Sequence, residues 1–333
     1  MTDTNTGAET NADVQAVDQL HQQYLQITER MGGVIVGQEE VIEQLMAALL
    51  CRGHCILEGV PGLAKTLMVS TLSSLLNQTF RRIQFTPDLM PSDILGTEVL
   101  EESASGKRNF RFIPGPVFAQ LLMADEINRA SPRTRSALLQ AMQEQHVTVA
   151  GTRHDLPKPF HVLATQNPLE QEGTYPLPEA QLDRFLMEID VTYPDRDSER
   201  KILFETTGAE ETRPKAAMTA EDIMAAQRLV RRLPVGESVV DAILALVRSA
   251  RPGPEGGEGA KLIAWGPSPR ASQSLMLAVR ARALLDGRLA PSIDDVIELA
   301  EPVLKHRMAL TFSARAEGES LEAVIARLKA RIG

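Results

Sequence analysis

The most restrictive feature of the chain is a glycine-containing loop that joins a short apolar run to a helical pattern. The loop reads Gly59-Val60-Pro61-Gly62-Leu63-Ala64-Lys65-Thr66, after the apolar residues 55–57 and before a helical pattern from Leu67 onward. Such a loop leaves backbone N–H groups free at the helix N-terminus, and glycines let this backbone approach a phosphate closely. Lys65 is placed to reach the β- and γ-phosphates, and Thr66 to bind Mg²⁺. The pattern predicts a phosphate-binding loop.

The loop departs from the strict pattern at Ala64, where glycine is usual. Alanine is tolerated there if the backbone angles are helical, because only a positive φ penalises a Cβ atom. We therefore expect helical angles at Ala64. The alternative interpretation is an ordinary strand-to-helix turn with an incidental lysine.

A second apolar run, residues 121–124, ends in the adjacent carboxylates Asp125 and Glu126. Buried parallel strands are apolar on both faces, and ligands bind at their carboxyl ends. Asp125 is the candidate to hold Mg²⁺, and Glu126 the candidate general base for an attacking water. The alternative is a solvated acidic strand end.

Five apolar runs are candidate buried strands, and helical or loop segments alternate with them. They are residues 55–58, 80–85, 121–125, 160–165 and 187–190. This alternation predicts an α/β fold with a parallel five-stranded sheet between helices. Beyond residue 195 the strand signal disappears, and we expect a helical domain over 195–333 after a core over 17–194. Residues 251–269 are rich in Gly and Pro and are expected to form a loop.

The flanks of these elements add further expectations. Residues 1–16 are polar and acidic and predict a disordered lead, followed by helices over about 17–31 and 39–50. Two insertions, at about 86–120 and 147–156, each read as containing a hairpin. Thr219-Ala220-Glu221-Asp222 and Ser292-Ile293-Asp294-Asp295 resemble capping boxes at helix starts.

Composition narrows the class of protein without naming its partner. The net charge is −9, which argues mildly against a nucleic-acid binder that relies on a basic surface. No cationic stretch typical of a signal peptide precedes Arg30, and no apolar stretch is long enough to span a bilayer, so a cytoplasmic location is expected. Cys51 and Cys55 lack a second ligand pair and are interpreted as small core residues.

Three further polar residues are candidates for the same site. Asn167 follows the fourth strand and would lie at the same sheet edge as Asp125, although an Asn-Pro pair is also a common turn former. Arg184 precedes the fifth strand, and its spacing alone favours a salt-bridged surface residue. Arg270 projects from a predicted helix N-terminus, where the helix dipole disfavours a cation. A bound phosphate or a nearby carboxylate would explain Arg270.

The ordered set of motifs resembles the MoxR family of AAA+ ATPases over about residues 34–308. The resemblance rests on the phosphate loop and on four later segments. These segments are Asp125-Glu126-Ile127-Asn128-Arg129-Ala130, Ala164-Thr165-Gln166-Asn167-Pro168, Leu182-Asp183-Arg184-Phe185 and Ser268-Pro269-Arg270. Ala64 matches this family's version of the loop.

The resemblance implies roles for individual residues. It implies ATP as cofactor, held by Val36, Gly37, Gln38 and by Gly59, Val60, Pro61, Gly62, Leu63, Ala64, Lys65, Thr66 and Leu67, with Mg²⁺ on Thr66 and Asp125. It implies Glu126 as base, Asn167 as first sensor, Arg184 as an arginine finger for a neighbouring subunit and Arg270 as second sensor. Whether Arg270 acts on its own or the neighbouring subunit stays open. The insertions are similar to this clade's helix-2 insert and pre-sensor hairpin.

The resemblance also implies a ring, normally hexameric, and chaperone-like remodelling of a protein partner. The partner is often a von Willebrand A-domain protein, and the process metal-cofactor insertion or maturation of a complex. Two alternatives stay open: a helicase-type nucleic-acid motor, since Lys107, Arg108, Arg153 and Lys158 lie in the insertions, and a Mg-chelatase-type motor subunit.

Overall fold

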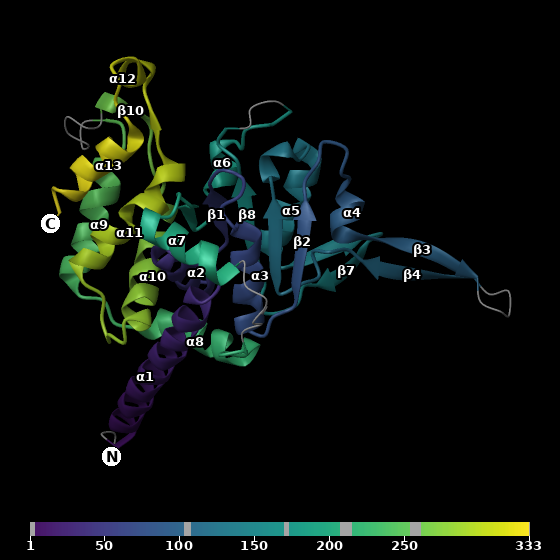
Figure 1. The fold of residues 1–333 in the computed structure, drawn as a ribbon, viewed down its shortest axis with the longest axis horizontal. Coiled ribbons are helices and arrows are strands. Elements are labelled where there is room, and N and C mark those ends of the chain that lie inside the picture. Colours follow the sequence, from purple (N-terminus) through teal and green to yellow (C-terminus); the bar gives the residue numbers. More distant parts are fainter. Residues whose placement is uncertain (1–3, 103–107, 170–172, 207–214, 254–260, 333) are drawn as a thin grey trace.

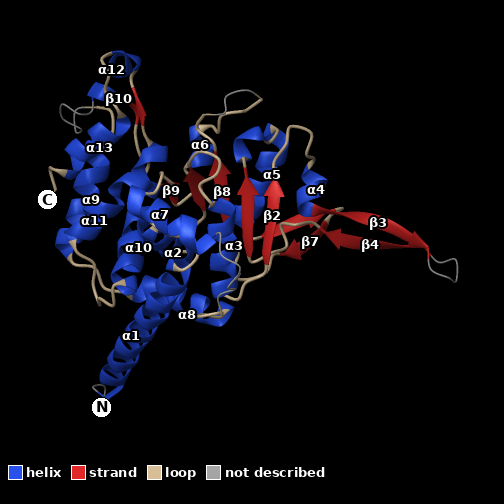
Figure 2. Ribbon diagram, in the orientation of Figure 1, coloured by secondary structure: helices blue, strands red, loops and turns tan. Residues whose placement is uncertain are grey.

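The computed structural model describes residues 4–102, 108–169, 173–206, 215–253 and 261–332, and its centre is a five-stranded parallel sheet in the order β2-β5-β8-β1-β9 (Figures 1 and 2). Its strands are β1 (Cys55–Glu58), β2 (Phe80–Gln84), β5 (Leu121–Asp125), β8 (His161–Gln166) and β9 (Met187–Asp190). Each begins and ends within one residue of its predicted bounds. The parallel α/β fold is therefore confirmed.

Helices cover both faces of this sheet because its central strands β1, β5 and β8 are buried on both sides. On β5, Leu121 and Met123 belong to the hydrophobic cluster that contains α2 (Glu39–Leu50) and α3 (Lys65–Leu75). Leu122 and Ala124, which point the opposite way, belong to the cluster that contains α5 (Pro132–Glu144). All of β5 is buried, which fixes the position of its carboxyl end.

Both insertions contain the predicted hairpins. The first consists of α4 (Pro91–Leu95) and the antiparallel strands β3 (Gly96–Glu102) and β4 (Arg108–Pro114), and its hairpin projects from the sheet (Figure 1). The centre of its predicted turn, residues 103–107, lies outside the described residues. The second pairs β6 (His146–Val149) with β7 (Thr152–Asp155). Phe112 of β4 stacks on His154 of β7 with 3.8 Å between ring centroids, so the two hairpins touch.

The C-terminal part is helical, with one departure from the prediction. Its helices are α7 (Arg196–Thr206), α8 (Ala220–Arg232), α9 (Glu237–Ser249), α10 (Pro269–Leu285), α11 (Ile293–Leu304), α12 (Phe312–Ala316) and α13 (Leu321–Lys329), with the 3₁₀ turn η4 (Lys305–Arg307). Both predicted capping boxes are present. However, β10 (Ile263–Trp265) pairs with β11 (Ala309–Leu310), so the expected absence of strands was wrong and the predicted loop over 251–269 contains a short strand. Strands this short carry no readable periodicity.

The N-terminal helix α1 (Thr4–Gly32) is longer than predicted. This helix includes residues 4–16, for which the sequence predicts a disordered lead. Val17 and Leu20 are buried in the core and anchor the helix, and extending an existing helix costs far less than nucleating one. Asp13 also forms an ion pair with Arg232 of α8 at 2.6 Å, a contact that a local sequence pattern does not reveal.

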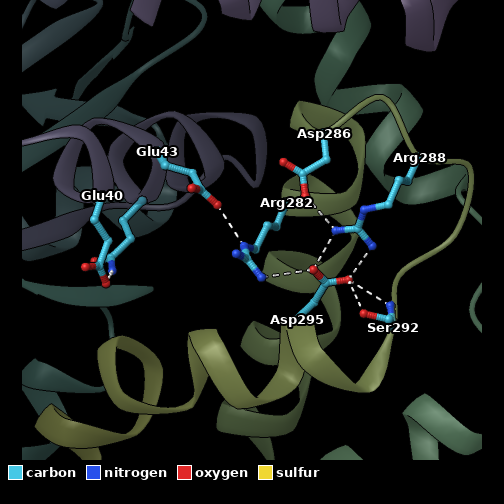
Figure 3. Close-up of polar contacts among 8 residues, drawn as sticks. Glu40, Glu43, Arg282, Asp286, Arg288, Ser292 and Asp295 are labelled. Carbon is cyan, nitrogen blue, oxygen red and sulfur yellow. Dashed lines mark hydrogen bonds and ion pairs between the residues drawn. The ribbon is translucent and has the colours of Figure 1, made fainter. Parts of the chain in front are cut away.

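A network of ion pairs fastens the helical part to α2 (Figure 3). Arg282 of α10 donates to Glu43 of α2 at 2.8 Å and to Asp295 of α11 at 3.2 Å. Arg288 donates to both carboxylate oxygens of Asp295, at 2.6 and 2.8 Å. Burial alone would raise the pKa of Asp295, but Arg288 and the Ser292 N–H bring it below its usual value. The buried carboxylate is therefore fully paired, which is the condition for a stable buried charge.

The two cysteines and the length of the helices can also be compared with the prediction. Cys51 and Cys55 are free and buried, and burial raises the pKa of both thiols, as expected for small core residues. Among the described helices, none has the length and apolar character needed to cross a membrane.

Candidate functional site

The phosphate-binding loop lies where β1 ends and α3 begins. Gly59 has no room for a side chain, because a Cβ atom there would lie 2.6 Å from the carbonyl oxygen of Val191. Gly62 has φ +91°, a conformation that favours glycine. The two glycines therefore serve different purposes, one giving close packing against the chain after β9 and the other a left-handed turn.

The backbone conformation of Ala64 differs from the prediction. Its backbone has φ +53° and ψ +21°, so the expectation of helical angles was wrong. The chain adopts this left-handed conformation directly before α3 starts at Lys65, at the position where the strict motif has glycine. A non-glycine residue in this region costs about 1–2 kcal/mol. Such strain is typical of functional turns that the surrounding structure holds in place.

Lys65 is held by the loop itself. Its ammonium group donates to the carbonyl oxygens of Gly59 at 2.5 Å and Val60 at 2.9 Å. Partial burial lowers the pKa of Lys65, while Asp125 and Glu126 raise it. The lysine thus lies between the loop carbonyls and the two carboxylates predicted to share its site.

One cavity of about 500 Å³ collects most of the predicted site residues. It is lined by Pro61, Gly62, Leu63, Ala64, Lys65, Thr66, Leu67, Arg82, Asp125, Glu126, Thr165, Gln166 and Asn167. The structure therefore brings together the loop, the acidic pair after β5 and the amide after β8, as the carboxyl ends of parallel strands require. Asp125 and Thr66 offer oxygen donors, which Mg²⁺ prefers, and Mg²⁺ is usually held by few protein ligands together with substrate phosphates.

Thr165 positions both acidic residues. Its hydroxyl donates to the Asp125 carboxylate at 2.5 Å and accepts from the Glu126 N–H at 2.9 Å. Glu126 has φ +56°, a second strained position in the cavity, and its carboxylate accepts from Arg129 at 3.0 Å. Thr165 was predicted only as the last residue of a strand, without a role in the site. The position of this hydroxyl directly after an apolar run is the sequence feature that could have indicated its role.

Arg82 of β2 was also missed. Its Nε donates to Asp125 at 3.0 Å, and a second guanidinium nitrogen contacts the same carboxylate oxygen. Arg82 and Asp125 are 43 residues apart in the chain and meet because β2 and β5 are neighbours in the sheet. No local sequence pattern points to this pair.

Arg184 and Arg270 do not line the cavity of their own chain. Arg270 Nη1 lies 3.3 Å from the carbonyl oxygen of Asp183 and 3.9 Å from its carboxylate, so the carboxylate alternative is the one observed. Within the described part of the chain, Arg184 shows no ion pair, which does not support the salt-bridged interpretation. Neither arginine is therefore part of the cavity that contains Lys65 in the same chain.

Arg307 fixes this group from inside the protein. It is 1% exposed, and its guanidinium binds the Asp183 carboxylate at 2.8 Å and the carbonyl oxygens of Phe185 at 2.6 Å and Leu186 at 3.0 Å. Burial lowers the pKa of Arg307, and Asp183 opposes that shift. Arg307 comes from η4, more than a hundred residues later in the chain, so no local pattern points to its contact with Asp183.

The implied nucleotide contacts before α2 lie apart from the loop cavity. Gly37 and Gln38 line a separate cavity of about 410 Å³ beside Glu188, Asp190 and Thr192. Gln38 donates to the Thr192 carbonyl oxygen at 2.8 Å. Val36 is buried. The structure does not bring these three residues into contact with the phosphate loop cavity.

Comparisons with known proteins agree with this geometry. Residues 54–187 match the ATPase family associated with various cellular activities (AAA), and residues 260–328 match the AAA lid domain. A protein of Mycobacterium tuberculosis named chaperone MoxR1 is 44% identical over 89% of this chain and 78% of its own length. Protein MoxR of Paracoccus denitrificans is 32% identical over 90% of this chain and 93% of its own length.

A solved structure supports the same assignment. The crystal structure of a Cytophaga hutchinsonii protein assigned as an ATPase superposes with a TM-score of 0.89 at 37% identity, covering 98% of both chains. Both the sequence and the fold are therefore shared over nearly the full chain. The chain belongs to the MoxR family of AAA+ ATPases.

Proposed function

We propose that this protein hydrolyses Mg-ATP as a subunit of a homo-oligomeric ring, normally a hexamer in this family, and uses the energy to remodel a protein partner. The observation that carries the proposal is the single cavity that contains Lys65, Asp125, Glu126 and Asn167. Phosphoryl transfer to water needs a cation for the phosphates, an oxygen ligand for the metal and a base for the water. This cavity offers all three.

The division of labour follows from the chemistry of each side chain. Lys65 leaves the Gly59 carbonyl and neutralises phosphate oxygens, while the loop N–H groups donate to them. Thr66 and Asp125 hold Mg²⁺, which neutralises charge on the β- and γ-phosphates when bound. Glu126 accepts a proton from the attacking water, and the Asn167 amide orients that water against the γ-phosphate.

The position of the two arginines supports the proposal of a ring. Arg184 does not line the cavity of its own chain and has no ion pair within the described residues, which supports its assignment to a nucleotide bound by a neighbouring subunit. An arginine finger supplied in trans accelerates phosphoryl transfer by about 10³ to 10⁵ in other systems. Arg270 contacts Asp183 and is assigned to the same subunit boundary.

The partner is proposed to be a protein, with a von Willebrand A-domain protein and metal-cofactor insertion as the specific form. The chaperone name of the M. tuberculosis relative supports protein remodelling. The charges in the hairpins do not favour the nucleic-acid alternative. Arg108 pairs with Glu102 at 3.3 Å, Arg111 with Glu101 at 2.9 Å and Arg153 with Asp155 at 2.8 Å, so a phosphate would compete with a carboxylate at each of these exposed arginines. A Mg-chelatase-type motor differs from this proposal only in its partner.

Two variants test the ATPase assignment. Lys65→Ala should abolish nucleotide binding, whereas Glu126→Gln should bind ATP normally and lose turnover, because Glu126 acts on the water and not on the phosphates. Binding is measured with a fluorescent ATP analogue and turnover by phosphate release. Undiminished hydrolysis by Glu126→Gln would exclude it as the base. Glu126→Gln, immobilised in the presence of ATP, can also be used to capture the protein partner.

A further inference from the structure

A four-charge junction joins the lid to the strand that leads into the phosphate loop. Lys305, the first residue of η4, places its ammonium group 3.3 Å from Glu58, 3.3 Å from Glu188 and 2.5 Å from Asp190. Glu58 is the last residue of β1 and directly precedes Gly59. Glu188 and Asp190 are alternate residues of β9 and therefore share one face of the sheet.

The ammonium group is held in place by its neighbours in η4. His306 contacts the carbonyl oxygen of Phe185 at 3.1 Å, and Arg307 binds Asp183 and two further carbonyls of the same segment. These contacts fix η4 to the segment that contains Asp183 and Phe185. Lys305 has little freedom to leave the acidic strand ends without moving the turn, and its side chain is only 14% exposed.

The charges in the junction do not balance. Three carboxylates face one ammonium group, and the Glu188 side chain is only 9% exposed. Burial raises the pKa of Glu188, Glu58 raises it further, and Lys305 opposes both. Burial alone would lower the pKa of Lys305, but Asp190, Glu188 and Glu58 raise it, so the lysine is charged at neutral pH.

The shortest contact is not the most important one. Asp190 is 42% exposed, so water screens its interaction with Lys305. Glu188 has no such screening, and because its pKa is raised to about 8, its negative charge is complete only above that pH. There, removing its cation would leave a buried carboxylate uncompensated, which is the costly way to break a buried pair. Replacing Glu188 with a neutral residue should therefore compensate best for the lost positive charge of Lys305.

The junction lies directly against the nucleotide-binding apparatus. The Glu58 carbonyl accepts from Val191 N–H at 2.7 Å, and the Gly59 N–H donates to Gln166 at 3.3 Å, while the Gly59 carbonyl binds Lys65. The backbone at Glu58 and Gly59 is therefore fixed by β8 and β9, and the Glu58 side chain by the lid. Repulsion among unneutralised carboxylates would act on this backbone.

We propose that Lys305 is a positioning residue for nucleotide binding: its ammonium group neutralises the acidic ends of β1 and β9 and so holds the lid turn η4 against the strand that leads into the phosphate loop. The proposal rests on the proposed ATPase function. Lys305 is not a lining residue of the phosphate cavity, so it acts through Glu58 and the loop and not on the phosphates.

The test uses charge rescue in the full-length protein. Lys305→Met should raise the KM for ATP about tenfold and change kcat far less, because Lys65, Asp125 and Glu126 are untouched. At a pH above the raised pKa of Glu188, which is about 8, the double variant Lys305→Met/Glu188→Gln restores the net charge and should recover most of the lost affinity. Lys305→Arg should behave as wild type. Lys329→Met is the matched control, since Lys329 lines the neighbouring cavity beside Glu188 without an ion pair to it among the described residues.

A second readout needs no nucleotide. Backbone amide exchange over residues 55–66 of the nucleotide-free protein should be faster in Lys305→Met and return toward the wild-type rate in the double variant. If wild-type protein fails to hydrolyse ATP, the proposed function fails, and this measurement still decides the role of Lys305. An unchanged KM and unchanged exchange in Lys305→Met would overturn the proposal. Failure of Glu188→Gln to rescue, including a double variant that does not fold, would overturn it as well.

Discussion

Arg82 Nε donates to the carboxylate of Asp125 at 3.0 Å, so the residue assigned to hold Mg²⁺ is ion-paired with a neighbouring strand. The Arg82 side chain is 46% exposed, and pairs of this kind contribute about 0–1 kcal/mol because water screens them. Mg²⁺ must compete with this guanidinium for a carboxylate oxygen.

Arg82→Gln should therefore lower the Mg²⁺ concentration that gives half-maximal ATPase activity, by about two- to fivefold, the range that a half-exposed pair allows. The measurement is a Mg²⁺ titration at fixed ATP. Arg81→Gln, on the opposite face of β2, is the control and should leave the titration unchanged. A higher Mg²⁺ requirement in Arg82→Gln would show that Arg82 assists the metal site.

Ala64→Gly should stabilise the protein. The positive φ of Ala64 costs about 1–2 kcal/mol, and glycine removes that cost while adding about 0.4–1 kcal/mol of unfolded-state entropy. We expect a net gain of about 0.5–1 kcal/mol in the free energy of unfolding. Urea denaturation measures it. Ala245→Gly, at an exposed position of α9, should instead lose about 1 kcal/mol. Equal losses in the two variants would contradict strain at Ala64.

The sequence indicates the parts of this fold that follow from local pattern. Most of the strands are runs of buried residues, which is how all five could be predicted, although the edge strand β2 also carries the exposed Arg81 and Arg82. The carboxyl ends of the strands bring Lys65, Asp125, Glu126 and Asn167 to one edge. The backbone angle of Ala64 was mispredicted because the strict motif, and not the residue type, dictates that turn.

Contacts across the fold could not be predicted in this way. Arg82, Lys305 and Arg307 meet their carboxylate partners only after strands or domains pack together, and none of them belongs to a recognisable spacing. The short strands β10 and β11 likewise exist because two distant segments pair with each other. Local pattern therefore located the site, and tertiary packing decides how its side chains are held.

Acid should destabilise the protein through its buried histidines. Burial lowers the pKa of His54 to about 3 and of His161 to about 4, against about 6.5 in an unfolded chain. Because the folded-state pKa values are depressed, these histidines favour the folded state above pH 6.5 and that contribution is lost as the pH falls toward 4 and 3.

Urea midpoints between pH 7.5 and 4.5 would measure this loss, with each histidine contributing up to about 1.4 kcal/mol per pH unit. His161→Gln removes one of the titrating groups and should flatten the dependence. Glu188 acts with the opposite sign, because its raised pKa favours folding at low pH and that contribution is lost as the pH rises. A pH dependence that is unchanged in His161→Gln would exclude His161 as a contributor.

Arg184 provides the test of assembly, because it does not line the cavity that holds Lys65 in the same chain. If it acts on a neighbour's nucleotide, Lys65→Ala and Arg184→Ala subunits are each inactive alone but complement each other when mixed. Some interfaces then pair an intact Lys65 with an intact Arg184, and an arginine supplied in trans is worth about 10³ to 10⁵ in rate. Phosphate release should therefore recover partially on mixing and should depend on protein concentration. Mixed rings must be confirmed by native mass spectrometry, and the absence of recovery in such rings at every mixing ratio would rule out a trans role for Arg184.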